Sequence, residues 1–133
     1  MPWQPLPVLF PDVELVLTEG IRDLLAARSI AGVHVGRKIP EERQLRMIVV
    51  NRDGGEDDGV TDRPRVRFRV WDEDEAKVGN LARLVVALVQ LLVGTTPIVR
   101  AEKISGPFEV PDTSRGHQRY LLFEIHTQGA QLS

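Results

Sequence analysis

The chain has no cysteine, few aromatic residues and almost no excess charge, and each shortage excludes a class of protein. Without cysteine there is no disulfide framework, no thiolate metal site and no cysteine nucleophile. Aromatic residues make up only 5% of the chain, whereas surfaces that hold single-stranded nucleic acid need several stacking rings. The formal net charge of -2 argues against binding to DNA or RNA through bulk positive charge.

Long apolar runs and targeting signals are also missing. The longest apolar run, Leu84 to Val93, contains Gln90 and is too short to span a bilayer. The opening stretch MPWQPLPVLF has no basic segment and is interrupted by prolines, so we expect no signal peptide. The hydrophobic fraction of 42% and the charged fraction of 27% are ordinary for a globular chain. We therefore predict a single domain over residues 1–133, with no membrane partner.

The motifs of common enzyme chemistry are absent from the sequence. There is no GxSxG, Walker A or GxGxxG pattern, and the three histidines have no HExxH or comparable metal spacing. The run DGGEDDGVTD misses the one-three-five carboxylate spacing of a calcium loop. Glu124 and His126 share one face of a predicted strand, which is more typical of a polar contact than of a metal site. The sequence thus predicts no enzyme, no cofactor and no metal.

Two helices are predicted from the hydrophobic periodicity. Residues 1–11 contain four prolines and form an extended strap in this prediction. Asp12 is the expected N-cap of a first helix that reaches about Arg28. The second helix is expected to begin with Asp72 and Glu75 as a capping box and to end near Gly94. Its second half is apolar almost all round, so another part of the fold or another subunit must cover it.

The strands are predicted from short alternating or fully apolar runs. A short extended piece, GVHVG, precedes the central strand LRMIVVN and the strand RVRFRVW. The run IVRAEKIS is edge-like, and RYLLFEIHT closes the sheet with Leu121, Phe123 and Ile125 facing inward. The runs RDGGEDDGVTDRP and GPFEVPDTSRGHQ are predicted loops. The expected fold is α+β, with two helices packed on a mixed, largely antiparallel sheet of four to five strands. The expected order is helix-strand-strand-helix-strand-strand, in a core over residues 12–129.

The strand RVRFRVW has an unusual outer face. Because side chains alternate along a strand, Arg65, Arg67 and Arg69 share one face with Trp71, opposite the apolar core positions. An ordinary solvated face is the simplest interpretation. Specific nucleic-acid recognition is disfavoured, because the charges lack flanking aromatics and the RNA-recognition signature is absent. A protein interface is the other interpretation, since Tyr120 adds to the mixed composition of this face.

Two long segments resemble the tail terminator proteins of long-tailed, non-contractile bacteriophages. They are VTDRPRVRFRVWDEDEAKVGNLARLVVAL and ISGPFEVPDTSRGHQRYLLFEIHTQG. The resemblance extends from about Phe10 to Gly129 and rests on structural rather than catalytic motifs. Two features depart from the family pattern, namely a His-Gln pair where a proline is expected and a heavier acidic run. The matching features are the Asp-led first helix, the RDGG run, Trp71, Gly106-Pro107, Pro111-Asp112 and Arg119-Tyr120.

The resemblance implies a structural virion protein. Members of the family form a hexameric ring on the head-proximal end of the tail tube, stop tube growth and provide the docking surface for the head connector. The implied partners are further copies of the chain, the tail tube protein and the head-completion protein. DNA is expected to pass through the ring without specific recognition. The implied location is the neck of the virion, after assembly in the host cytoplasm.

The predicted interface combines the ends of the two hairpins with the arginine face. Two other functions stay open at this point. One is a different phage neck, head-completion or tail-assembly protein, and the other is a small host α+β module that binds a ligand or RNA. The predicted interface residues are Asp53, Gly54, Gly55, Glu56, Asp57, Asp58, Arg65, Arg67, Arg69, Trp71, Arg115, His117 and Tyr120.

Overall fold

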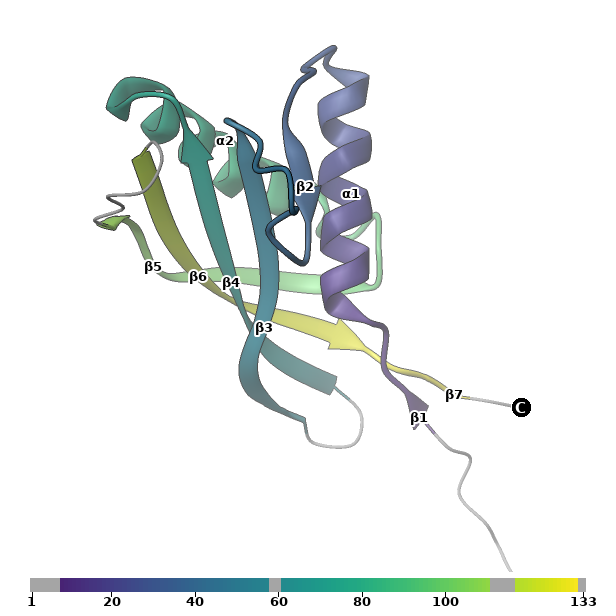
Figure 1. Cartoon of the computed structure of the whole chain (residues 1–133). Helices are drawn as coiled ribbons and strands as arrows, with labels where there is room; N and C mark the ends of the chain where they lie inside the picture. Colours follow the sequence, from purple (N-terminus) through teal and green to yellow (C-terminus); the bar gives the residue numbers. More distant parts are fainter. Residues whose placement is uncertain (1–7, 58–60, 111–116, 132–133) are drawn as a thin grey trace, which may run out of the picture.

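The fold is taken from a computed structural model, which describes residues 8–57, 61–110 and 117–131. Figure 1 shows a curved sheet with α2 crossing behind its strands and α1 running beside β2. The elements, in chain order, are β1 (Val8–Leu9), α1 (Val13–Ala27), β2 (His34–Gly36), β3 (Met47–Asp57), β4 (Thr61–Asp72), α2 (Glu75–Leu91), β5 (Ile98–Val110), β6 (His117–Gln128) and β7 (Ala130–Gln131).

The main sheet has five strands in the order β2-β3-β4-β6-β5. The β2–β3 pairing is parallel, and the pairings of β3 with β4, β4 with β6 and β5 with β6 are antiparallel. Over the residues that the structure describes, the chain is therefore an α+β protein with two helices and a mixed sheet. The predicted element order is only partly right, because β2 enters the sheet as an additional strand between α1 and β3. Separately, β1 and β7 pair as a two-stranded ribbon.

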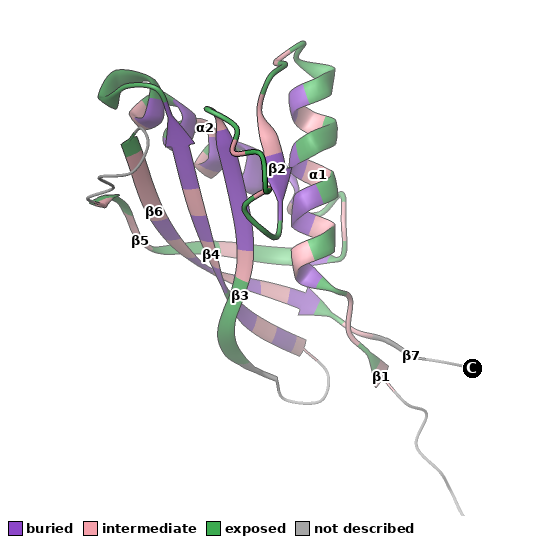
Figure 2. Cartoon of the chain, viewed as in Figure 1, coloured by how far each residue is buried: buried purple, intermediate pink, exposed green. Residues whose placement is uncertain are grey.

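Both helices pack on the same face of the sheet and enclose the core. The predicted inward face of β6 is confirmed, since Leu121, Phe123 and Ile125 are fully buried. The apolar positions of β4 alternate in the same way, as the banded colouring of Figure 2 shows. Phe68 meets Phe123 edge to face, with ring centroids 5.5 Å apart. The helical side of this core includes Leu17, Ile21, Leu25, Val78, Leu81, Val85, Leu88 and Val89.

The start of α1 follows the prediction, whereas the start of α2 does not. The Asp12 side chain accepts a hydrogen bond from the Leu15 amide at 3.2 Å, which confirms it as the N-cap. In α2 the N-cap is Asp74, and the predicted capping box that begins at Asp72 is wrong. Asp72 instead ends β4 in extended backbone and is buried. The last residue of α2 is Leu91 and its C-cap is Leu92, so the predicted end near Gly94 is right to within two residues.

Replacing Asp74 with alanine should lower the free energy of unfolding by about 1 kcal/mol, because the Lys77 amide loses its side-chain acceptor. Asp74→Asn keeps an acceptor oxygen and should lose less. Urea denaturation of the three proteins measures the difference. Equal midpoints for wild type and Asp74→Ala would show that this cap contributes nothing.

The two predicted loops are wrong over most of their length, because the strands continue into them. The β3–β4 ladder runs to Asp57 and resumes at Thr61, with a bulge between Arg52 and Gly55. Gly55 has a φ of +107°, and a Cβ there would lie 2.3 Å from the Arg63 carbonyl oxygen, so only glycine fits this bulge. Strand β5 likewise reaches residue 110 and β6 begins at residue 117.

Some predictions fall where the structure gives no description. Residues 1–7 of the predicted strap are outside the described residues, while residues 8–9 belong to β1. Asp58 and Arg115, both predicted interface residues, also lie outside them. Glu56 and Asp57 are placed within β3, where they pair with Arg63 and Asp62 in the ladder.

Candidate interaction surface

A row of four arginines runs along the sheet face that the helices leave uncovered. This face, which neither helix covers, is the outer face of the sheet. Arg63, Arg65, Arg67 and Arg69, the arginine row, occupy alternate positions of β4, the middle strand of the sheet. Arginines two residues apart on an extended strand are separated by about 7 Å along the chain. The alternation predicted for Arg65, Arg67 and Arg69 is confirmed by the buried residues between them.

The arginine row is flanked by polar and apolar side chains rather than by a second row of charges. In the ladder with β6, Arg67 lies opposite Leu122 and Arg69 lies opposite Tyr120. Beyond Tyr120 comes Phe108 on β5, which is 54% exposed. The outer face thus combines guanidinium groups with apolar and aromatic surface, which is the mixture found in protein interfaces.

The row has no ion-pair partner among the carboxylates whose side chains the structure describes. Glu124 lies opposite Arg65 in the ladder without forming an ion pair with it. The Glu124 Oε1 instead lies 2.7 Å from the His126 Nε2, the polar contact that the sequence predicts. Burial, together with the neighbouring charge of Arg67, lowers the pKa of Arg69. The row therefore carries self-repulsion that an anionic partner would relieve.

Hydrogen bonding within the row is also incomplete. The Nε atoms of Arg63, Arg67 and Arg69 are buried without a hydrogen-bond partner. Arg69 uses a terminal nitrogen to donate to Asn51 Oδ1 at 3.2 Å. A buried donor that lacks a partner costs about 1–3 kcal/mol, so added acceptors here would be stabilising.

Trp71 closes one end of the row but is buried, with 3% of its surface exposed. It shares the outer face with Met47 and Val49 in a small cluster apart from the main core. Two guanidinium carbons, of Arg43 and Arg69, lie 5.5 Å and 5.6 Å from the centroid of the indole ring. The sequence predicts Trp71 as a contact residue, whereas in the folded chain the arginines cover it.

Several of the other predicted residues gather at the opposite end of the row. A polar groove of about 500 Å³ is lined by Asp53, Gly55, Arg63, Arg65 and Glu124. Asp53 and Gly55 are predicted interface residues, and Gly54 lies between them in β3. Sequence reasoning missed Arg63 and Glu124 as members of this site. The period-two alternation of β4 extends back to Arg63, but Pro64 and the preceding glycines favoured a loop there.

Tyr120 and His117 occupy different parts of β6. Tyr120 borders the arginine row, as predicted. His117 is exposed at the start of the strand, where it lies opposite Asp72 and away from the groove. The predicted residues are therefore brought together only in part.

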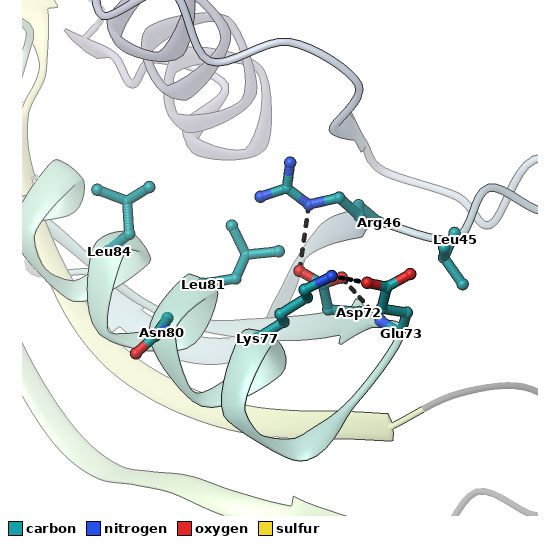
Figure 3. A pocket seen from close by; sticks show the side chains of 8 residues that line it. All are labelled: Leu45, Arg46, Asp72, Glu73, Lys77, Asn80, Leu81 and Leu84. Atoms are coloured by element: carbon teal, nitrogen blue, oxygen red, sulfur yellow. Dashed lines mark hydrogen bonds and ion pairs between the residues drawn. The ribbon is translucent and has the colours of Figure 1, made fainter.

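A second groove, of about 390 Å³, lies at the first turns of α2 (Figure 3). Leu45 stands at one side and is 56% exposed, while Leu81 and Leu84 project from the helix on the other side. Its charged groups are already paired. Arg46 Nε lies 3.1 Å from the buried Asp72 carboxylate, and Lys77 pairs with Glu73. This groove offers apolar surface but no free charge.

Two further properties of the described residues limit the chemistry of the surface. No group of three or more histidine, aspartate or glutamate side chains there is arranged to hold a metal ion. In the same residues, no helix combines the length and the apolar character needed to cross a membrane.

Comparison with known proteins identifies no relative. A scan against protein-family models found none that matches the chain, and a search of curated proteins found no match.

Proposed function

We propose that this protein is a bacteriophage tail terminator, a structural subunit that caps the head-proximal end of the tail tube. The observation that carries the proposal is the outer face. It presents an arginine row without ion-pair partners in the described residues, flanked by Tyr120, Leu122 and Phe108. A face of this composition suits contact with other protein subunits better than exposure to water. The resemblance of the two long segments selects the terminator among such subunits.

Binding alone is sufficient for this function. Tube subunits add head to tail, so the end of a growing tube always presents the surface for the next copy. A terminator matches that surface on one side and offers no equivalent on the other, which stops growth without making or breaking a bond. The free side then provides the docking surface for the head connector.

The proposed assembly is a ring of six copies at the neck of the virion. Each copy in a closed ring contacts its neighbours through two different patches, so the chain must carry two complementary surfaces. The tube protein and the head-completion protein are the other partners, and DNA passes through the ring without being read. This assembly forms in the host cytoplasm.

Deleting the gene from the phage tests the proposal. Heads should fill with DNA but carry no tails, and detached tubes of irregular, excessive length should accumulate. Electron micrographs of the lysate provide the measurement, and wild-type protein supplied from a plasmid is the control. Tubes of normal length that stay unattached would indicate a head-completion or other neck role instead. Normal tails on filled heads would rule out both roles.

A further inference from the structure

The exposed side of α1 carries an acidic stripe formed by Leu15, Glu19, Asp23 and Ala26. These residues recur every three or four positions, so they share the face opposite the buried residues Val13, Leu17, Ile21 and Leu25. Figure 2 shows this outward side of α1 as exposed. The stripe and the arginine row belong to opposite layers of the domain, because α1 packs on the core face of the sheet.

The two acids of the stripe are without ion-pair partners among the described residues, as the arginine row is. Glu19 and Asp23 form no ion pair within the described residues, and two like charges four positions apart on a helix repel each other. The nearest cation in sequence is Arg22. Its guanidinium is occupied by the Val35 carbonyl oxygen, to which Nε donates at 2.9 Å and a terminal nitrogen at 2.5 Å.

We propose that the arginine row of one copy docks against the acidic stripe of α1 in a second copy. The spacings agree. Four residues of helix rise about 6 Å and two residues of strand about 7 Å, so Glu19 and Asp23 can meet two successive arginines. Leu15, which is 42% exposed, supplies the apolar counterpart of Tyr120 and Leu122. The contact covers the bare sheet face with a helix of the second copy, while α1 and α2 of the same chain cover the core face.

This contact rests on the proposed ring and names the surfaces that join its subunits. The row and the stripe are different patches, so the contact is head to tail rather than two-fold symmetric. The burial of Trp71 also disfavours single-stranded nucleic acid as the partner, because it leaves the indole of Trp71 unavailable for stacking on a base.

Cysteine cross-linking of the isolated protein tests the contact. The natural chain has no cysteine, so each introduced thiol is the only one in its chain. Ala26→Cys places a thiol in the acidic stripe, and Leu122→Cys places one opposite Arg67 on the outer face. Mixed at high protein concentration under mild oxidation, the two variants should form a mixed dimer about tenfold faster than a control pair. The control pairs Ala26→Cys with Leu91→Cys, an exposed position of α2.

A charge swap then shows whether the contact depends on these charges. Adding Glu19→Lys and Asp23→Lys to the Ala26→Cys chain should reduce the rate of mixed-dimer formation about tenfold. Adding Arg65→Glu and Arg67→Glu to the partner chain should restore it. The matched control reverses Glu41 and Glu42, two exposed acids outside the stripe, and should leave the rate unchanged.

Three outcomes would overturn the contact. The first is a rate of mixed-dimer formation no higher than that of the Leu91→Cys control. The second is a rate that the charge reversals do not change. The third is tight binding of short single-stranded DNA at physiological salt that the Arg65→Glu and Arg67→Glu substitutions abolish. The last result would assign the row to nucleic acid. Cross-linking as expected beside normal tails in the deletion phage would uphold the contact and reject the terminator function. Absence of the cross-link, beside tailless heads and overlong tubes in the deletion phage, would reject the contact and uphold the terminator function.

Discussion

Replacing Arg52 with methionine will lower the free energy of unfolding by about 3 kcal/mol, because it strands a buried carboxylate. Asp62 is 2% exposed and accepts two hydrogen bonds from the Arg52 guanidinium, at 2.8 Å and 2.9 Å. This pair joins β3 to β4 beside the bulge. Because the Arg52 side chain is 37% exposed, we expect a loss at the lower end of the range for broken buried pairs.

Chemical denaturation measures this loss, and two further variants show its origin. Arg65→Met removes an arginine from β4 that has no ion pair in the described residues, and should change stability by less than about 0.5 kcal/mol. Combining Arg52→Met with Asp62→Asn removes the stranded charge and should recover part of the stability. A single variant as stable as wild type would show that the pair contributes nothing to stability.

Replacing Phe68 with alanine will have an effect of similar size, about 4 kcal/mol, through a cavity at the centre of the core. Phe68 is fully buried, and its edge-to-face contact with Phe123 joins two neighbouring strands. Because small proteins are stable by only about 5–15 kcal/mol, the variant should be close to unfolding at physiological temperature.

Phe108→Ala is the matched control for this substitution. Phe108 lies on edge strand β5 and is 54% exposed, so its loss should stay within about 0.5 kcal/mol. Thermal unfolding followed by circular dichroism compares the two proteins with wild type. If the Phe68→Ala and Phe108→Ala proteins melted at similar temperatures, the burial of Phe68 would not contribute the expected stability.

The elements that sequence reasoning found are those specified by local periodicity. The first helix follows from Asp12 and the apolar repeat that comes after it. The core faces of β4 and β6 follow from strict alternation, which also places Arg65, Arg67 and Arg69 on one side. These signals lie within short segments and need no knowledge of the partner strand.

The errors arise where a distant partner decides the structure. The DGG run has the composition of a loop, but pairing with β4 across a bulge keeps it in β3. Asp72 and Asp74 both fit a helix start, and the pairing of Asp72 with His117 on β6 keeps the first of them in the strand. Trp71 lies under the guanidinium of Arg43, which comes from the connection between β2 and β3.

The ribbon of β1 and β7 has a consequence for the order in which the chain assembles and opens. It pairs Val8 with Gln131 and Leu9 with Ala130, residues from opposite ends of the chain. Joining such distant segments closes the longest loop in the protein, and the entropy lost grows with loop length. Strands of two residues form few hydrogen bonds, so they offset little of that entropy loss. We therefore expect the ribbon to form after the sheet and to open without it, so that in a hydrogen-exchange measurement its amide hydrogens exchange with solvent while those of β4 stay protected.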